Sequence, residues 1–351
     1  MKAVTVRPGV ADSLRLDDVD EPSRRADQLL VETIAVGVCG TDREVIGGDL
    51  GYPEEGTDRL ILGHEALGRV KEAPEGSGFA PGDLVAPIVR RPDPVPCPNC
   101  AIGEWDMCRN GRFTEAGIRG LDGYAAGRFA LDPEFAIRTD ESLGLLGVLI
   151  EPASVVAKAW EHILHIGSRS RWEPTRTLIT GAGPIGLLAA LFAARLGGEV
   201  HVLDLMTEGP KPDLARDLGA TYHHQGLDEI EEVEVVIECT GADAVVAGVM
   251  THTAANGIVC LTGVPSSGQS PPAVELAHEL VMENDVVFGT VNAGRRHYEE
   301  AARVLAEADR SWLERVVNRR LPVARWESAY APEPDDVKTV IEFAAVGDAT
   351  S

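Results

Sequence analysis

Positive charge is scarce in this sequence. Among 351 residues there are 32 Lys or Arg against 56 Asp or Glu, which gives a formal net charge of −24, and only five of the basic residues are Lys. A strongly acidic surface repels nucleic acid and anionic membranes, so we expect neither as a partner. Two origins of the acidity stay open: a compositional bias toward Arg, or a surface adapted to high salt, where counter-ions screen the self-repulsion. Only the second predicts a melting temperature that rises with molar KCl.

Other features are also missing or rare. Aromatic residues make up 5% of the chain, so the cores should consist mainly of Val, Ile, Leu and Ala. Six cysteines are too few for a disulfide scaffold in a chain of this length. The N-terminus has no apolar secretion signal, and we expect no apolar run of membrane-spanning length. These absences predict a cytoplasmic protein.

The chain is long enough for two domains, and the pattern of apolar residues changes along it. From residue 1 to about 172, short apolar segments alternate with Gly, Pro and Asp, and the clearest strand candidates are 29–36, 66–71 and 83–89. Many short strands with regular turn signals indicate a small barrel-like β domain. A helix is predicted over 153–166, after Pro152, and it could bridge the two domains.

From residue 173 to 293, strands and helices alternate. Continuous apolar strands are predicted at 177–180, 199–204, 233–238, 257–261 and 285–289, with helices at 187–196 and 214–218. This alternation is typical of a doubly wound parallel sheet, so the fold class is α/β. A helix at 297–307 opens a C-terminal segment, 294–351, that we expect to return to the first domain.

A glycine-rich turn follows the first of these strands. In Gly181-Ala182-Gly183-Pro184-Ile185-Gly186, the first glycine permits the tight turn, the second lets the backbone approach a pyrophosphate, and the third allows close packing of helix and strand. Asp204 lies about 20 residues on, at the end of the next strand, where a carboxylate accepts hydrogen bonds from both ribose hydroxyls. The sequence therefore predicts a dinucleotide site that favours NAD over NADP, although Lys211 and Arg216 are close enough in sequence to reach a 2′-phosphate.

Three ligand-type residues precede the turn. Cys39, His64 and Glu65 offer a thiolate, an imidazole and a carboxylate, each near a glycine in a β-rich stretch. This set suits a catalytic zinc ion, which takes three protein ligands and leaves one position open. The carboxylate ligand is either Glu65 or Glu151, and Glu65 is costly to bury without a cation.

Three further cysteines have the spacing of a metal-binding loop. Cys97, Cys100 and Cys108 supply three thiolates, and Asp93 is the nearest upstream candidate for a fourth ligand. The alternative is a loop that has lost its metal, because an incomplete ligand set binds weakly. Cys239 and Cys260 lie in apolar strand patterns and are predicted to be core residues.

Together these motifs resemble the zinc-dependent medium-chain dehydrogenases, and within them the archaeal-type glucose dehydrogenase branch. The similarity runs along nearly the whole chain, and the matching segments are Cys39–Glu44, Leu62–Ala66, Val89–Pro92, Glu115–Ile118, Gly120–Tyr124, Ile150–Pro152, Thr262–Pro265, Gly289–Asn292 and Lys338–Phe343. The resemblance implies a GroES-like catalytic domain, a Rossmann domain, and a homodimer or homotetramer.

It also implies roles for individual residues. Cys39, His64 and Glu65 would ligate the catalytic zinc, with Glu151 near or on the metal. Thr41, Glu115, Glu151 and Asn292 would contact sugar hydroxyls, and Thr41 would be the first proton acceptor. The coenzyme would be contacted by Gly181, Gly183, Pro184, Ile185, Gly186, Asp204, Thr240, Thr262, Gly263, Val264, Thr290, Val291 and Asn292.

Three departures from the family pattern matter. Pro94 stands where the first of four loop cysteines is expected, which leaves a second, structural zinc open. Val89 and Met282 replace polar residues that contact the sugar in some relatives, and no arginine pair follows Asp204. The expected reaction is oxidation of the C1 hydroxyl of glucose or a related aldose to a lactone. The alternatives are a polyol or secondary-alcohol dehydrogenase, a zinc-free quinone-reductase-like enzyme, and a non-catalytic NAD sensor.

Overall fold

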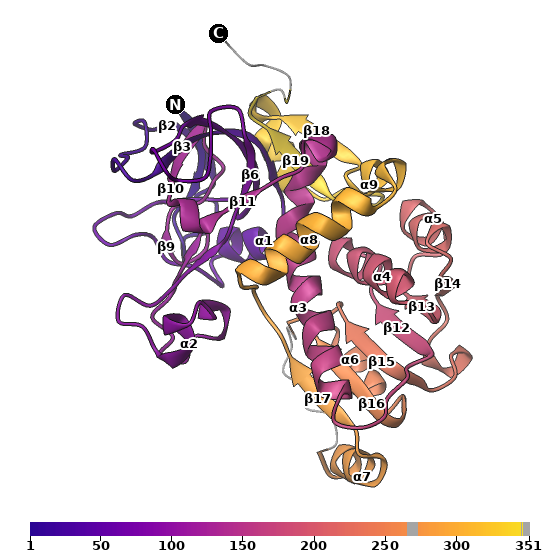
Figure 1. Cartoon of the computed structure of the whole chain (residues 1–351). Coiled ribbons are helices and arrows are strands. Elements are labelled where there is room, and N and C mark those ends of the chain that lie inside the picture. The colour runs from indigo at the N-terminus through magenta and orange to yellow at the C-terminus, as the bar shows by residue number, and fades with distance from the viewer. Residues whose placement is uncertain (265–272, 345, 347–351) are drawn as a thin grey trace. The chain divides into compact units, whose positions relative to one another are not determined.

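The computed structural model describes residues 1–264, 273–344 and 346, and these form two compact units (Figure 1). Unit 1 comprises Met1–Ser154 and Asn292–Ser351, and unit 2 comprises Val155–Val291. The first boundary falls inside a helix rather than at residue 172, and the chain re-enters unit 1 at Asn292 rather than at residue 294. Pro265, the last residue of one matching segment, lies outside the described residues.

Unit 1 is built on β-sheets. Its largest sheet has the strand order β11-β6-β5-β3-β19-β18, with β10 paired to β3, and two three-stranded sheets have the orders β2-β1-β4 and β7-β8-β9. The strands are β1 (Lys2–Val6), β2 (Arg15–Asp18), β3 (Leu29–Gly37), β4 (Leu60–Ile61), β5 (Glu65–Glu72), β6 (Leu84–Pro87), β7 (Arg90–Arg91), β8 (Thr114–Ala116), β9 (Gly120–Leu121), β10 (Arg128–Leu131), β11 (Ala136–Arg138), β18 (Arg319–Pro322) and β19 (Thr339–Glu342).

Helices complete unit 1, and its last strands come from the C-terminal part of the chain. The helices are α1 (Gly40–Gly47), α2 (Pro98–Ala101), α8 (Arg295–Glu307), α9 (Arg310–Val316) and α10 (Trp326–Tyr330), with short 3-10 turns at Trp105–Met107, Pro133–Phe135, Glu141–Leu149 and Val323–Arg325. Strand β19 pairs antiparallel with β3, and β18 pairs parallel with β19. The C-terminal segment is therefore part of the sheet that carries the N-terminal half of unit 1.

Unit 2 is a six-stranded parallel sheet. The strands are β12 (Arg176–Thr180), β13 (Glu199–Leu203), β14 (Thr221–His223), β15 (Val233–Glu238), β16 (Thr253–Leu261) and β17 (Val286–Gly289). Their order is β14-β13-β12-β15-β16-β17, and every neighbouring pair is parallel. This is the strand order of doubly wound dinucleotide-binding folds. The sequential order of the strands reverses between β12 and β15, while the strands stay parallel. The predicted parallel sheet and the α/β class are confirmed.

The helices of unit 2 connect these strands. They are α4 (Pro184–Leu196), α5 (Pro210–Asp217), α6 (Asp243–Val249) and α7 (Ala273–Glu283), with a 3-10 turn at Leu227–Glu229, and α3 (Ile150–Gly167) runs from unit 1 into unit 2. A buried cluster around Leu178, Val236 and Val259 packs the middle of the sheet. Its apolar, mostly β-branched side chains explain why the continuous strand pattern was readable in the sequence.

One segment, Glu141–Gly167, has the length and hydropathy of a membrane-spanning helix, which the sequence analysis did not expect. It has 27 residues, and 83% of its most apolar window is buried inside the protein. Gly144 has φ 51° and ψ −130°, so the 3-10 turn before α3 is broken there and the continuous helix is shorter. Such burial is typical of a core helix.

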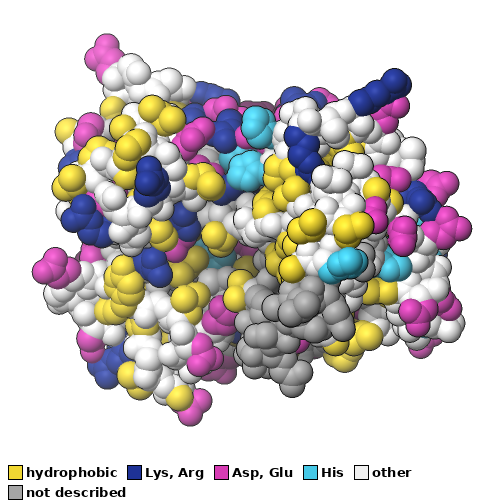
Figure 2. All heavy atoms as spheres, turned by 90° about the horizontal axis from the view of Figure 1, so that it is seen from below, with side chains coloured by type: hydrophobic (Ala, Val, Ile, Leu, Met, Phe, Trp, Pro, Cys, Tyr) yellow, Lys and Arg dark blue, Asp and Glu magenta, His cyan; other side chains and the backbone are white. Residues whose placement is uncertain are grey.

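The charged side chains are mixed on the surface. On the face drawn in Figure 2, Asp and Glu side chains are spread between Lys and Arg side chains, and the described residues of this face show no continuous basic patch.

Candidate functional site

The three predicted metal ligands of unit 1 lie together. One ligand atom each of Cys39, His64 and Glu65 falls within 4.8 Å of the other two, and His64 and Glu65 are buried. Three donor atoms of zinc-ligand type have therefore been brought into one small buried site from two separate chain segments. This arrangement fits a divalent cation, because thiolate, imidazole and carboxylate are the ligand types that zinc takes.

Local structure positions each of these side chains. Cys39 follows β3 and is the N-cap of α1, where its backbone N–H donates to Asp42 Oδ2 at 2.8 Å. Gly63 has φ +86°, a left-handed conformation that lets the chain turn directly before His64. Glu65 then opens β5, whose pairing with β3 places Glu65 opposite Gly37.

Asp42 orients the imidazole of His64. Its Oδ1 lies 3.3 Å from His64 Nδ1, and neither atom makes a well-aligned hydrogen bond within the described residues. Burial is the largest single influence and lowers the pKa of His64, but Asp42 and Cys39 together outweigh it and hold the pKa well above its ordinary value. With Nδ1 facing the carboxylate, Nε2 is the nitrogen left for a metal, as in carboxylate–histidine–zinc arrangements.

A buried lysine accompanies Glu65. Lys338, which is 2% exposed, forms an ion pair with Glu65 Oε2 and donates to the carbonyl oxygen of Val38 at 3.0 Å. Burial is the largest single influence and lowers the pKa of Lys338, but Glu65, Cys39 and Asp42 together raise it above its ordinary value, so the lysine is charged. A Cβ at Gly37 would overlap Glu65 and Lys338, so glycine is needed there. The sequence analysis assigned Lys338 no role, although Lys338 begins one of the matching segments.

Glu151 lies near this group but is not a member of it. Burial raises the pKa of its carboxyl to about 7; His64 opposes this rise and Glu65 adds to it. A metal-ligand role for Glu151 therefore stays a prediction. Thr41, the predicted proton acceptor, is half-buried in the first turn of α1, next to Asp42.

Two of the predicted sugar contacts touch each other. Asn292 Nδ2 donates to Glu115 Oε1 at 3.0 Å. The same oxygen accepts from Arg90 through Nε at 3.1 Å and a terminal guanidinium nitrogen at 2.9 Å. Arg90 is buried, lies 3.8 Å above the ring of Phe113, and was not singled out from the sequence as a functional residue.

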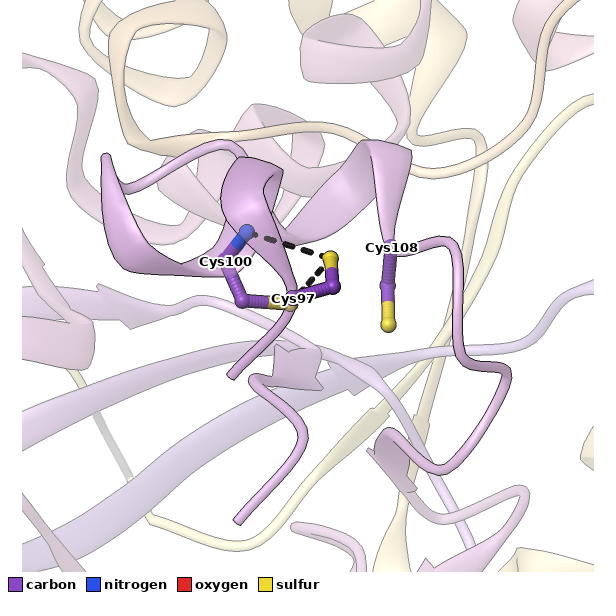
Figure 3. Close-up of side chains that lie close together, drawn as sticks. All are labelled: Cys97, Cys100 and Cys108. Atoms are coloured by element: carbon purple, nitrogen blue, oxygen red, sulfur yellow. Dashed lines mark hydrogen bonds between the residues drawn. The ribbon is translucent and has the colours of Figure 1, made fainter. Parts of the chain in front are cut away.

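The cysteine loop of unit 1 forms a second group of ligand atoms. The sulfur atoms of Cys97, Cys100 and Cys108 lie within 4.8 Å of one another, with 3.6 Å between the first two (Figure 3). Backbone N–H groups of Arg109 and Cys100 lower the pKa of the Cys97 thiol to about 6. Three clustered thiols, one of them easily ionised, fit a soft cation.

Asp93 is not part of that group. One carboxylate oxygen accepts from the Val95 N–H at 2.8 Å, and the other accepts from Arg112 Nε at 3.2 Å. The geometry therefore gives no support to Asp93 as the fourth ligand. Among the described residues, no carboxylate joins the three cysteine sulfur atoms in this group.

In unit 2 the glycine-rich turn has the geometry that the sequence predicts. Gly183 is the N-cap of α4 and Pro184 occupies the first turn. A Cβ at Gly186 would collide with the carbonyl oxygen of Gly181, whereas one at Gly183 would meet nothing within 4 Å. The open space at Gly183 and the N–H groups at the start of α4 fit a pyrophosphate.

Asp204 lines a pocket at the end of β13. Its Oδ2 accepts from Ala182 N–H at 2.6 Å and its Oδ1 accepts from Met206 N–H at 3.1 Å. The pocket has a volume of about 390 Å³ and is mostly apolar, with Leu205, His224 and Leu227 among its lining residues. Its size and its carboxylate fit an adenosine moiety.

The remaining coenzyme candidates lie at the ends of β15, β16 and β17. Thr240 follows β15, Thr262 and Gly263 follow β16, and Thr290 N–H donates to the carbonyl oxygen of Leu261 at 3.0 Å. Val264 and Val291 are apolar yet 74% and 64% exposed. The buried Lys158 donates to the carbonyl oxygen of Val291 at 3.2 Å, a contact that the sequence did not predict.

Fold and site together define a class, the zinc-dependent medium-chain dehydrogenases. The family described as alcohol dehydrogenase GroES-like domain matches residues 25–141, and the family described as glucose dehydrogenase C-terminus matches residues 144–343. The chain belongs to the glucose dehydrogenase family. The recognised family and the GroES-like and Rossmann fold are thus confirmed.

Curated relatives and solved structures agree. A glucose 1-dehydrogenase 1 of Caldivirga maquilingensis is 40% identical over 98% of this chain and 99% of its own length. A glucose 1-dehydrogenase of Methanocella arvoryzae is 38% identical over 98% of this chain and 100% of its own. The glucose dehydrogenase of Haloferax mediterranei, solved with NADP, Zn and gluconolactone, superposes with a TM-score of 0.92 at 32% identity, covering 98% of this chain and 100% of that one.

Proposed function

We propose that this protein oxidises the C1 hydroxyl of an aldose, glucose or a related sugar, to the lactone and transfers the hydride to a nicotinamide coenzyme. The observation that carries the proposal is the convergence of Cys39, His64 and Glu65 within 4.8 Å in a member of the glucose dehydrogenase family. The gluconolactone in the Haloferax mediterranei structure supports a lactone as the product. When bound, zinc supplies Lewis acidity to a substrate hydroxyl and the coenzyme supplies the hydride acceptor.

The residues of the chain divide the remaining work. Cys39, His64 and a carboxylate from Glu65 or Glu151 hold the metal, and Asp42 fixes the ring of His64 through the 3.3 Å contact. Lys338 balances the charge of Glu65, so that the metal ion and the lysine would share one buried carboxylate. The group is thereby kept close to neutral when a substrate enters.

Thr41 and the pair of Glu115 and Asn292 act on the sugar. The Thr41 hydroxyl accepts the proton of the C1 hydroxyl while it releases its own proton toward solvent, so it acts as a relay. Its half-buried place in α1 beside Asp42 keeps it within unit 1, near the metal ligands. Glu115 accepts hydrogen bonds from ring hydroxyls, and Asn292 donates hydrogen bonds to them. These contacts orient the sugar rather than adding chemistry.

For the coenzyme we propose NAD in preference to NADP, although the Haloferax mediterranei protein holds NADP. Asp204 is held by two backbone N–H groups at the adenosine pocket, where its charge repels a 2′-phosphate. Arg216, the nearest arginine after it, pairs with Asp213 at 3.3 Å and lies over the ring of Tyr222. The ratio of kcat/KM for the two coenzymes tests this choice, and a clear preference for NADP would contradict it.

The test of the reaction is a screen for NAD⁺ and NADP⁺ reduction over matched panels of aldoses and polyols, with and without a chelator. We expect turnover with one or more aldoses and a lactone as product. The chelator should abolish the activity, and added zinc should restore it. Faster turnover of polyols would favour the runner-up, a polyol dehydrogenase. Full activity in chelated, zinc-free protein would contradict the proposal.

Two finer points accompany the proposal. The three thiols Cys97, Cys100 and Cys108 would hold a second, structural zinc, and metal analysis of the wild type against Cys100→Ser counts it. The assembly would be a homodimer or homotetramer, which light scattering determines.

A further inference from the structure

We infer that Glu238 is a positioning residue for the nicotinamide coenzyme, which it serves by fixing the segments Thr240–Gly241 and Thr262–Gly263 at the carboxyl edge of the sheet. The inference rests on the proposed use of a nicotinamide coenzyme. From the sequence, Glu238 was only the last residue of a predicted strand.

Glu238 is a carboxylate buried in a place where a charge is costly. It ends β15 and is 0% exposed. Within the described residues, no cationic side chain forms an ion pair with it, and its partners are hydroxyl and amide donors instead. A buried charge without a counter-ion needs such donors, so their arrangement is the part of the structure that the residue stabilises.

The side chain gathers donors from two strand ends. Glu238 Oε1 accepts from the N–H of Thr240 at 2.7 Å, from the hydroxyl of the same residue, and from the N–H of Gly241 at 3.1 Å. It also accepts from the hydroxyl of Thr180 at 3.3 Å. Oε2 shares the N–H of Gly241 at 3.1 Å. The backbone N–H groups among these partners can only donate, so the carboxyl oxygens of Glu238 act as acceptors here.

The main chain of Glu238 binds the third strand end. Its carbonyl oxygen accepts from the N–H of Thr262 at 2.9 Å, the N–H of Gly263 at 3.1 Å and the hydroxyl of Thr262 at 2.7 Å. A Cβ at Gly263 would lie 2.7 Å from Glu238 Oε2, so the two segments also pack directly on the carboxylate.

The location of these contacts gives them a function. Thr180 ends β12 and directly precedes Gly181 of the pyrophosphate turn, and β12 and β15 are the strands between which the sheet order reverses. In open α/β sheets ligands bind outside the carboxyl ends of the strands at that reversal. Glu238 therefore links the pyrophosphate turn to the two segments predicted to face the coenzyme.

Preorganisation is the physical consequence. A loop that is already held in its bound conformation loses less entropy when a ligand binds, so its affinity is higher. Removing the carboxylate should loosen Thr240–Gly241 and its link to Thr180 and weaken coenzyme binding. The main-chain hydrogen bonds to Thr262 and Gly263 and the metal group of unit 1 are left intact.

The experiment measures the dissociation constants of NAD⁺ and NADP⁺ by calorimetry on the zinc-loaded protein, without sugar. Glu238→Gln keeps the side-chain volume, but it turns an amide N–H₂, which is itself a donor, toward the groups that donate to the carboxylate. We expect it to weaken binding of the preferred coenzyme by about tenfold or more, as for the loss of a charged hydrogen bond. The zinc content and the KM for sugar at saturating coenzyme should stay near the wild-type values.

Glu234→Gln is the matched control. Glu234 lies on the same strand and also accepts from backbone N–H groups, those of Thr175 and Arg176 at 3.1 Å and 2.8 Å, but near the amino end of β15. We expect wild-type coenzyme affinity for it. Equal losses in both variants, or a Glu238→Gln variant with lowered melting temperature and unchanged coenzyme affinity, would reduce Glu238 to a structural residue and overturn the inference.

A second set of variants decides the matter if Glu238→Gln does not fold. Thr240→Val removes one donor and Thr240→Ser keeps it, so only the first should weaken coenzyme binding. Where Glu238→Gln folds, the double variant with Thr240→Val should lose less than the sum of the two single losses. Additive losses, or equal affinity in Thr240→Val and Thr240→Ser, would overturn the inference. A wild-type protein that binds neither coenzyme would instead overturn the proposed function itself.

Discussion

Asn292 donates a hydrogen bond from Nδ2 to Oε1 of Glu115 at 3.0 Å, although 177 positions of sequence separate them. Asn292 is also where the chain re-enters unit 1, and its φ of 60° is one that Asn tolerates better than most residues. Two of the four residues that the family resemblance names as sugar contacts are thus one hydrogen-bonded unit.

Asn292→Asp tests that unit. Asp tolerates the same backbone conformation but loses the Nδ2 donor and sets a carboxylate against Glu115. We expect the KM for aldose to rise by about tenfold or more, because a hydrogen bond to a charged group is lost. Steady-state kinetics at saturating coenzyme measure it. The control is Asn256→Asp, because Asn256 also has a positive φ but lies in unit 2. An unchanged KM for Asn292→Asp would contradict the role of Asn292.

Arg90 should control the same carboxylate. Arg90→Lys keeps the charge but loses the two-donor contact with Glu115, and Arg90→Met loses both. We therefore expect the KM for aldose to rise in the order wild type, Lys, Met, by about tenfold at each step. Arg119→Met is the control, since Arg119 lies 5.0 Å from the ring centroid of Phe113 but makes no side-chain bond to Glu115. Sugar KM values equal in all variants would refute the assignment.

The metal group predicts a separation between turnover and coenzyme binding. Cys39→Ala or His64→Ala should lower kcat by about a thousandfold, because the Lewis acid supplies several kcal/mol of stabilisation to the transition state. The metal content should fall by one ion per chain while NAD⁺ binding persists. Cys260→Ala, in a core strand, should change neither. Near-normal turnover by Cys39→Ala would exclude the group as the catalytic centre.

A histidine pair on β13 and β14 predicts a pH dependence of stability. His201 Nδ1 lies 2.9 Å from His223 Nε2 with the rings stacked. Burial is the largest influence and lowers the pKa of both; for His201, Arg176 lowers it further while Glu199 and Glu231 oppose this, and for His223, His201 and His224 lower it further while Glu229 opposes this. The unfolded chain then binds more protons than the folded one, so stability is present at neutral pH and is lost as the pH falls below the ordinary histidine pKa.

Thermal melts check this sign. The melting temperature should be lower at about pH 5.5 than at about pH 8, and His201→Asn should reduce the difference because it removes one of the two protonation sites. His165→Asn, on an exposed part of α3, should leave the difference unchanged. A larger pH dependence in His201→Asn than in the wild type would contradict the interpretation.

Local patterns explain what was predictable. The strands of unit 2 and the glycine turn were found because continuous apolar segments and glycine spacing are properties of neighbouring residues. The third strand candidate of unit 1, 83–89, was too long, since β6 ends at Pro87. Cys39, His64 and Glu65 were found because they are zinc-ligand types near glycines and because Glu65 is costly to bury without a cation, and the structure brings them together.

The partners of these residues were not predictable. Lys338 binds the backbone of Val38 across 300 positions, and Arg90 is an ordinary arginine until the fold buries it against Glu115. Glu238 ends a predicted strand like any other acidic residue, and only burial without a cation marks it. Each contact arises from packing between distant segments, which no local pattern records.

By itself the sequence determined the α/β class, the glycine-rich turn and the candidate metal ligands, because spacing and residue type act over short distances. The tertiary structure decided which acidic side chains are buried and which groups stabilise them. Lys338 pairs with Glu65 and Arg90 pairs with Glu115, whereas hydroxyl and amide donors bind Glu238. The reason is physical, since the free energy of a charge depends on its solvent exposure and its neighbours, and both are fixed only when the chain has folded.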